Sequence, residues 1–183
     1  MRRILLIMVL CLLAVASTGC KKARLRAQLK ELMSSTIVPP EKISCVYNGE
    51  VFPMPDSLRD KAKLFVYIDS TECSKCRISR FIQYDPFFAE AEASSKYEVM
   101  LLLSFKEGES EEIIEFLTLL ELPFPVFIDI EHLFSHLNPL LPSDYRFHSM
   151  LLDRRGRPLF FGDPVSNDKA RDLFYNRLSA MPS

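Results

Sequence analysis

Two cysteines stand two residues apart where an apolar run gives way to a helix-like stretch. The run is Leu64–Ile68, the cysteines are Cys73 and Cys76, and the helix-like residues are 77–82. This order predicts a strand that leads into a helix, with the first thiol near the helix N-terminus. The partial positive charge at that end favours the thiolate. Because the thiolate is the species that attacks disulfides, the segment predicts a redox-active dithiol.

The N-terminus has the pattern of a secretory signal. A basic start is followed by an apolar run, Ile4–Ala16, and then by the segment Ser17–Cys20. The run is short for a membrane span, which takes about 20 apolar residues, so it indicates a signal peptide. The cysteine after Thr-Gly resembles the lipobox of bacterial lipoproteins, although leucine is commoner at the position of Ser17. We therefore predict a lipoprotein signal peptide over residues 1–19 and lipidation of Cys20.

Residues 20–42 form a predicted tether between the lipid and the body of the protein. Leu25, Leu29 and Leu32 recur at helical spacing, which predicts a short amphipathic helix. The basic side chains of the tether would face anionic lipid head groups or lie in solvent. The lipoprotein prediction places the protein on a membrane of the cell envelope, facing the periplasm. The alternatives are a secreted protein cut nearby and an anchor that is never cleaved.

The charge of the chain excludes one class of partner. Lys and Arg total 23, Asp and Glu total 24, and the net charge is −1. A nucleic-acid-binding protein needs a basic face, which this balance does not indicate, so we expect no nucleic-acid partner. Residues 43–183 are long enough for one domain with a sizeable core.

Two further side chains near the dithiol segment have alternative interpretations. Cys45 lies in a strand-like apolar run, where a buried and inert thiol is expected; a resolving partner for the dithiol is the alternative. Asp69 precedes Cys73 and is expected to cap a helix or shape the loop. The alternative for Asp69 is a base that accepts the proton of the thiol.

Apolar runs and helical patterns alternate along residues 43–181. Strands are predicted at 43–47, 50–52, 64–68, 97–105, 125–130, 147–152 and 158–161. Helices are predicted at 76–93, with an interruption near Pro86, and at 110–122, 131–140 and 167–181. Asn48-Gly49 separates the first two strands and is a strong hairpin signal. The alternation predicts an α/β fold with a central mixed sheet flanked by helices and an N-terminal β-hairpin.

This element order, with the cysteines at the start of the first core helix, resembles the thioredoxin-like fold. More narrowly, the chain is similar to membrane-tethered periplasmic thiol-disulfide oxidoreductases of the TlpA and ResA type. The matching residues are the strand Leu64–Ile68 before Cys73-Ser74-Lys75-Cys76, and Met150–Gly156, which is similar to a strand-and-turn motif of that family. The resemblance covers about residues 43–181.

The resemblance implies roles for the two cysteines. Cys73 would be the nucleophile that attacks a partner disulfide, and Cys76 the resolving thiol that releases the reduced partner. We also expect protein thiols or disulfides of the cell envelope as partners, a monomer, and no resident cofactor or metal. Lys75 would lower the pKa of the attacking thiol through its positive charge, and Glu72 would oppose this effect.

Two departures from the family leave other functions open. Glu72 stands where tryptophan is usual, and Arg146–Ser149 lacks the proline that forms a cis peptide bond in the family. Phe147 or His148 is expected opposite Cys73, and there His148 would tune the thiol, ligate a metal or do neither. One alternative function is a copper- or zinc-binding module built from Cys73, Cys76 and His148. Another is a non-catalytic thioredoxin-like interaction module.

Overall fold

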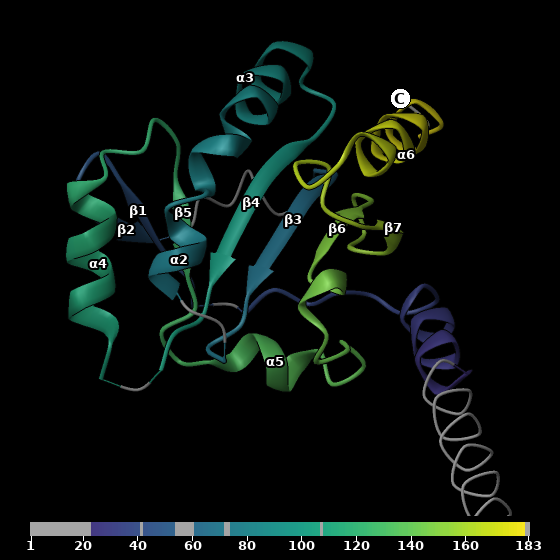
Figure 1. Ribbon diagram of the computed structural model, residues 1–183, viewed down its shortest axis with the longest axis horizontal. Helices are drawn as coiled ribbons and strands as arrows, with labels where there is room; N and C mark the ends of the chain where they lie inside the picture. Colours follow the sequence, from purple (N-terminus) through teal and green to yellow (C-terminus); the bar gives the residue numbers. More distant parts are fainter. Residues whose placement is uncertain (1–22, 41, 54–60, 72–73, 107, 182–183) are drawn as a thin grey trace, which may run out of the picture.

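The computed structural model describes residues 23–40, 42–53, 61–71, 74–106 and 108–181. One mixed sheet runs through the molecule, and helices cover both of its faces (Figure 1). The predicted signal peptide and Cys20 lie outside the described residues, so the predicted boundaries at residues 19 and 42 stay predictions. Within the described ranges, no helix is both long and apolar enough to cross a membrane.

Seven strands form the sheet. They are β1 Ser44–Tyr47, β2 Glu50–Pro53, β3 Lys63–Ile68, β4 Glu98–Leu103, β5 Val126–Ile128, β6 Ser149–Leu152 and β7 Pro158–Phe161. Their order across the sheet is β2-β1-β5-β4-β3-β6-β7. β4 pairs in parallel with both β3 and β5, whereas the other neighbours are antiparallel. The predicted mixed sheet, with the hairpin at one edge, is confirmed.

Helices connect the parallel strands and cover the sheet. They are residues 23–32, α2 Ser74–Ile78, the 3-10 helix η2 Phe81–Tyr84, α3 Asp85–Ser94, α4 Ser110–Leu119, α5 Leu133–Leu137, the 3-10 helix η3 Tyr145–Phe147 and α6 Asp168–Ser179. α2, η2 and α3 lead from β3 to β4, and α4 leads from β4 to β5. These are the helical crossovers that parallel neighbours require.

The helix predicted over residues 76–93 is divided into three pieces. α2 ends at Ile78, η2 follows, and α3 begins at Asp85. Pro86 falls in the first turn of α3, where its missing N–H has no partner within the helix in any case. The predicted interruption is confirmed, but it precedes the proline. The helix that carries Cys76 is therefore little more than one turn long.

Asn48 and Gly49 form the turn between β1 and β2. Their φ angles are 51° and 76°, and a two-residue hairpin turn of this kind needs positive values at both positions. Tyr47 pairs with Glu50 directly beside the turn. The hairpin predicted from Asn-Gly is confirmed.

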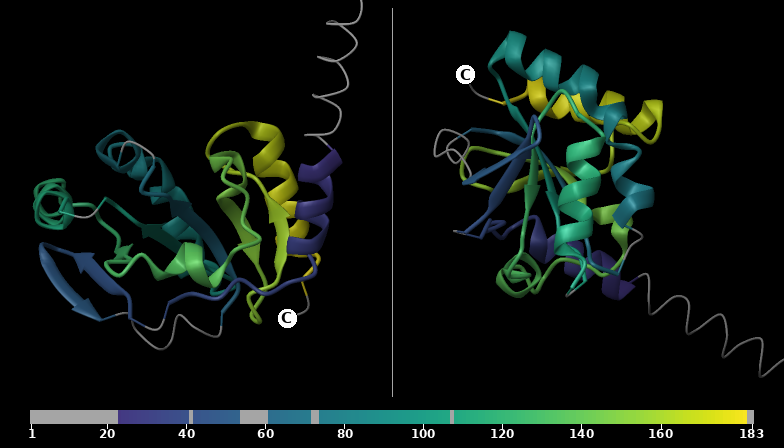
Figure 2. Two further views of the ribbon diagram at one scale, coloured as in Figure 1. Left: turned by 90° about the horizontal axis from the view of Figure 1, so that it is seen from below. Right: turned by 90° about the vertical axis from the view of Figure 1, so that its left-hand side faces the viewer.

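β3 is buried on both faces, as its unbroken apolar sequence predicts. Alternate residues enter two separate cores: Leu64 packs on the face covered by α2, α3, α4 and α6, and Phe65 packs on the other face. α5 closes the second face with Phe134, together with Leu32 and Ile37 from the predicted tether. Figure 2 shows helix 23–32 and α5 on the side of the sheet away from α3.

Candidate functional site

The carboxyl ends of β3, β4 and β5 meet at one edge of the sheet, because these strands are parallel. Asp69, Ser104 and Asp129 directly follow the three strands. α2 begins shortly after β3, so it stands at the same edge. Sites in open α/β sheets form outside the carboxyl ends of the strands, which makes this edge the candidate site.

Cys76 is exposed on α2 and is disulfide-bonded. The other cysteine within the described ranges, Cys45, is free. Cys73 lies outside those ranges, and its role as nucleophile stays a prediction. The buried side chain of Ile78 anchors α2 to the first core. This anchor fixes α2 on the sheet while Cys76 remains accessible.

The dipole of α2 is weaker than the sequence predicts. A helix dipole sums over the aligned peptide units, and α2 spans only Ser74–Ile78. It therefore contributes less positive charge at its N-terminus than a helix over residues 76–93 would. The stability of a thiolate here depends correspondingly more on neighbouring side chains.

Lys75 is held by α4. Its ammonium forms an ion pair with Glu112, and its Nζ lies 5.8 Å from the centre of the Phe116 ring. The Glu112 carboxylate offsets the positive charge that is expected to lower the pKa of the attacking thiol. The tuning role predicted for Lys75 is therefore opposed by its own ion-pair partner.

η3 lies beside α2, in the segment where the family has its cis-proline. The guanidinium carbon of Arg77 is 5.8 Å from the centre of the Tyr145 ring, a cation–π contact that joins the two elements. No peptide bond within the described ranges is cis. Instead, Asp144 holds the turn: its Oδ1 accepts the backbone N–H of Arg146 at 3.2 Å and the Nε–H at 2.9 Å.

His148 is buried, with 3 % of its surface exposed. Its Nε2 lies 2.8 Å from the carbonyl oxygen of Pro142, and because a carbonyl only accepts, this nitrogen carries the proton. The His148 carbonyl accepts the N–H of Tyr67 at 2.9 Å, and the two rings lie 5.3 Å apart. Burial raises the pKa of Tyr67 to about 12. These contacts hold the His148 ring and backbone in place, and its predicted role in thiol tuning or metal ligation stays a prediction.

Two aspartates shape the loops at this edge. The Oδ1 of Asp69 accepts the N–H of Thr71 at 2.8 Å, which is the loop role expected from the sequence. Asp129 is buried, and its carboxylate accepts the N–H groups of Leu133 and Phe134 at 3.0 and 2.9 Å. Asp129 therefore fixes the start of α5, a role that the sequence analysis did not assign to it.

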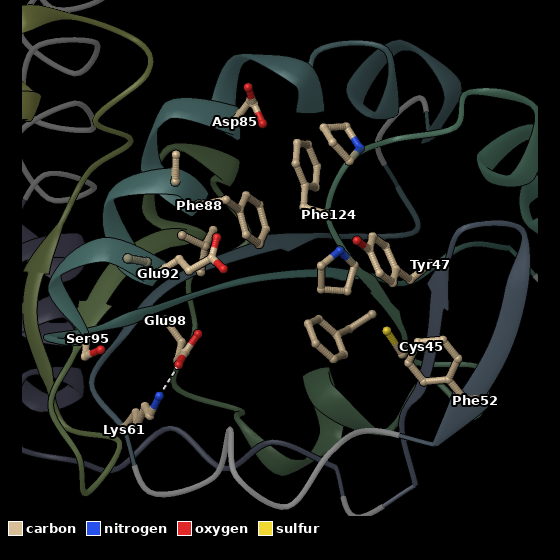
Figure 3. A pocket seen from close by; sticks show the side chains of 16 residues that line it. Cys45, Tyr47, Phe52, Lys61, Asp85, Phe88, Glu92, Ser95, Glu98 and Phe124 are labelled. Atoms are coloured by element: carbon tan, nitrogen blue, oxygen red, sulfur yellow. Dashed lines mark hydrogen bonds and ion pairs between the residues drawn. The ribbon is translucent and has the colours of Figure 1, made fainter.

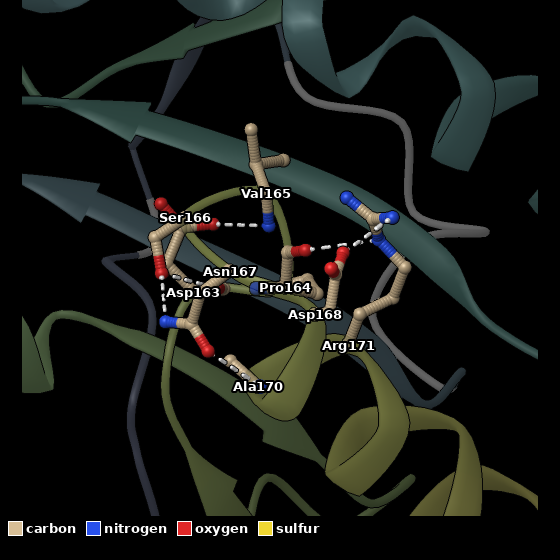
Figure 4. A network of polar contacts seen from close by, with 8 residues as sticks. All are labelled: Asp163, Pro164, Val165, Ser166, Asn167, Asp168, Ala170 and Arg171. Carbon is tan, nitrogen blue, oxygen red and sulfur yellow. Dashed lines mark hydrogen bonds and ion pairs between the residues drawn. The ribbon is translucent and has the colours of Figure 1, made fainter.

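The loop between β7 and α6 forms a further side of the site, next to η2. Asp163 accepts the N–H of Val165 at 3.0 Å, and Asn167 caps α6 by accepting a backbone N–H of its first turn at 2.9 Å (Figure 4). A small hollow of about 20 Å³ between this loop and η2 is bordered by Asp163, Arg77 and Arg80. The loop thus places a carboxylate close to the arginines that follow Cys76.

A cavity of about 610 Å³ lies at the other end of the parallel strands (Figure 3). Phe88 and Phe124 stack in its wall, with ring centres 4.3 Å apart. Pro123 and Pro125 precede β5, and because proline has no N–H to donate, the ladder between β4 and β5 is limited to two residue pairs. The two strands separate beyond that point, and residues of both border the cavity.

Cys45 borders this cavity, and its thiol is expected to be unreactive. The residue is 1 % exposed, and burial raises the pKa of its thiol to about 12. A protonated thiol is a poor nucleophile at neutral pH. The prediction of a buried cysteine is confirmed, and its inertness stays a prediction.

Metal binding has no support from the described side chains. No group of three or more His, Cys, Asp and Glu residues within these ranges is placed to hold a metal ion. A copper or zinc module that uses Cys73 reaches outside the described ranges and stays a hypothesis.

Sequence reasoning missed Arg77 on α2 and the residues that contact α2. Arg77 follows Cys76 directly and could have been considered from its position alone. Tyr145 and Glu112 lie far along the chain, and no local pattern distinguishes them from other exposed residues.

No protein-family model and no curated protein sequence match this chain. A solved structure described as the thiol:disulfide interchange protein DsbE from Chlorobium tepidum matches with a TM-score of 0.51 and 13 % identity, over 79 % of this chain and 98 % of that one. AhpC from Enterococcus faecalis matches with a TM-score of 0.46 and 11 % identity, over 80 % and 95 %. The first match shows that the fold is thioredoxin-like, which confirms the predicted fold class.

Proposed function

We propose that this protein is a thiol-disulfide oxidoreductase of the cell envelope, with Cys73 and Cys76 as its redox pair. The observation that carries the proposal is the state of Cys76, which is disulfide-bonded and exposed at the carboxyl edge of a thioredoxin-like sheet. We infer Cys73 as its partner, because a Cys-x-x-Cys segment at a strand–helix junction brings two thiols within bonding distance.

In the proposed reaction, the Cys73 thiolate attacks one sulfur of a partner disulfide. A bond forms between Cys73 and that sulfur, the partner's S–S bond breaks, and the other partner sulfur leaves and takes a proton from water. The Cys76 thiolate then attacks the Cys73 sulfur, and the first partner sulfur leaves in turn. Two electrons pass to the partner, and Cys73 and Cys76 end as a disulfide.

The surface around α2 supports a protein partner. Tyr145 and Ile82 are 54 % and 52 % exposed, and Arg77 lies against the Tyr145 ring. Exposed aromatic and aliphatic side chains suit a partner segment that is apolar. We infer that the partner contacts Tyr145 and Ile82 while its disulfide meets the cysteines.

We further propose that the chain is anchored in a membrane of the cell envelope by a lipid on Cys20, facing the periplasm. The support is the lipobox-like sequence that ends at Cys20. Leu32 and Ile37 of the predicted tether are buried in the second core. The stretch of chain between the proposed lipid and the domain is therefore short. Cys20→Ala is expected to prevent lipid labelling and to release the protein from membrane fractions.

Trapping of a mixed disulfide tests the oxidoreductase proposal. In the full chain, Cys76→Ser is expected to retain a partner on Cys73 as a complex that reductant releases on a gel. Cys45→Ser is the matched control and is expected to behave as wild type. Graded redox buffers followed by alkylation are expected to show Cys73 and Cys76 oxidised together. If both thiols stay reduced or are alkylated independently across the range, the proposal is wrong.

A non-catalytic interaction module is the second candidate function. The chain has no tryptophan, so the residue that is usual before the first cysteine has no substitute elsewhere. The ion pair of Glu112 with Lys75 also weakens the local support for a thiolate. Binding of the same partner with unchanged affinity by Cys73→Ser/Cys76→Ser would favour this second function over redox catalysis.

A further inference from the structure

A hollow bordered by arginines lies between the β6–β7 turn and the end of α6. Its volume is about 530 Å³, and Leu159 and Met181 provide apolar surface inside it. Its charged border consists of Asp153, Arg154, Arg155, Arg157 and Arg177. In a chain whose net charge is −1, four cations and one anion around a single hollow form a local positive site.

This hollow is separate from the dithiol site. β6 is antiparallel to β3, with Ser149 opposite Val66 and Leu152 opposite Lys63. β6 therefore enters the sheet near the carboxyl end of β3 and leaves it at the opposite edge. The β6–β7 turn lies at that opposite edge, so a ligand bound there is a strand's length away from α2 (Figure 1).

The turn is held in one conformation from two sides. The Asp153 carboxylate accepts the N–H groups of Arg155 and Arg157 at 2.8 and 2.9 Å. Gly156 has a φ of 75°, and a Cβ there would lie 2.7 Å from the Ile37 carbonyl oxygen, so only glycine fits. Ile37 also donates its N–H to the Gly156 carbonyl at 2.8 Å. A preformed turn loses little conformational entropy when it binds a ligand.

Three of the four guanidinium groups have no ion-pair partner within the described part of the chain. Arg157 donates its Nε–H to the Asp153 carboxylate at 2.8 Å. The one carboxylate that borders the hollow is therefore already paired with an arginine. Arg154, Arg155 and Arg177 form no ion pair with any described residue. Arg177 lies in the last turn of α6, where the helix dipole favours a cation. Arg154 and Arg155 lie outside α6, so the helix dipole does not explain why arginines occupy their positions.

The chemistry of the border selects a class of ligand. The planar N–H fork of a guanidinium matches two oxygens of a phosphate or carboxylate. Arg154 and Arg155 also border a second hollow of about 240 Å³, whose wall includes Phe65, Met100 and Leu152. An anion held by the two arginines therefore has apolar surface within reach in both hollows. The matching ligand is an oxyanion attached to an apolar body.

We propose that the β6–β7 turn and the end of α6 form a binding site for an organic phosphate or carboxylate. Arg154 and Arg155 hold the oxyanion, Arg177 adds a third positive charge, and Leu159 and Met181 contact the apolar body. Anionic lipid head groups and soluble amphiphilic anions share this chemistry.

The test uses the full chain in phosphatidylcholine nanodiscs, with hexyl phosphate as the probe and titration calorimetry as the measurement. Hexyl phosphate is expected to bind at one saturable site, inorganic phosphate to bind more weakly, and hexanol not to bind. Arg154→Gln/Arg155→Gln is expected to weaken hexyl phosphate binding by about tenfold or more, because hydrogen bonds to a charged group are lost. The matched control Lys96→Gln/Lys169→Gln removes the same charge at exposed positions elsewhere and is expected to leave the affinity unchanged.

Nanodiscs that contain phosphatidylglycerol distinguish the two sources of the ligand. Competition by the lipid supports a head-group ligand, and unchanged hexyl phosphate affinity supports a soluble one. The proposal is overturned if the double arginine variant binds as tightly as wild type while remaining folded by circular dichroism. It is equally overturned if hexanol binds as well as hexyl phosphate, or if no saturable binding occurs.

Discussion

Replacing Asp129 with alanine is expected to destabilise the protein by about 3 kcal/mol. The residue is completely buried, and its carboxylate accepts hydrogen bonds from three groups. These are the backbone N–H groups of Leu133 and Phe134, at 3.0 and 2.9 Å, and the hydroxyl of Ser104, at 3.2 Å. Alanine removes every one of these acceptors.

The magnitude follows from two losses. Loss of a side-chain cap at a helix N-terminus costs about 0.5–2 kcal/mol. A buried donor left without an acceptor costs about 1–3 kcal/mol, and the Phe134 N–H and the Ser104 hydroxyl both enter that state. We take the lower part of each range, because the space left by the carboxylate is polar and can admit water. The consequence is a looser α5, whose Phe134 ring lies 4.4 Å from the Tyr67 ring in the second core.

Urea unfolding and thermal unfolding, both followed by circular dichroism, measure this change. For a chain of this size, about 3 kcal/mol corresponds to a Tm lower by about 6–12 °C. Asp129→Asn keeps one acceptor oxygen and is expected to lose less stability than Asp129→Ala. The control Glu131→Ala breaks an exposed ion pair with Lys42 and is expected to change stability by less than about 1 kcal/mol. An alanine variant within about 1 kcal/mol of wild type would refute the reasoning.

Three other predictions concern the thiols. Glu112→Gln is expected to lower the pKa of the attacking thiol Cys73, because the carboxylate that offsets the Lys75 ammonium is removed. The pH dependence of alkylation measures this pKa, with Glu111→Gln as the control. An unchanged or higher pKa in Glu112→Gln would contradict the prediction. Burial raises the pKa of Cys45 from 9.0 to about 12, so native protein near neutral pH is expected to leave Cys45 unalkylated, whereas urea-unfolded protein is alkylated there. The pKa of the Cys45 thiol is higher in the folded state than in the unfolded state, so its contribution to the free energy of unfolding is fully present below pH 9.0 and is lost as the pH rises toward about 12. Cys45→Ala is expected to reduce this loss of stability at high pH. An identical pH profile of stability in the variant and the wild type would contradict the assignment.

The strands could be predicted because their signals are local. The apolar run Leu64–Ile68 is long enough to need burial on both faces, and β3 has that burial. Asn48-Gly49 fixed the hairpin because few residues adopt positive φ at two successive positions. The predicted strands 97–105 and 125–130 both exist but are shorter at each end, as β4 and β5.

Element boundaries were less predictable where capping groups come from other parts of the fold. The helix predicted over 131–140 is only Leu133–Leu137, because its start depends on the Asp129 carboxylate and its first residues are loop. The strand predicted over 147–152 begins at Ser149, since Asp144 draws the preceding residues into η3. Hydrogen bonds to such caps compete with the local propensity that a sequence pattern records.

The sequence alone determined which segments become strands and helices, and it placed two cysteines at a strand–helix junction, because hydrophobic periodicity and turn residues act between near neighbours. Only the tertiary structure decided the surroundings of that junction. Lys75 meets Glu112 from 37 residues away, and Arg77 meets Tyr145 from another part of the sheet. The order β5-β4-β3-β6 brings these segments to one edge, and strand order depends on the packing of the whole chain, which no short stretch of residues encodes.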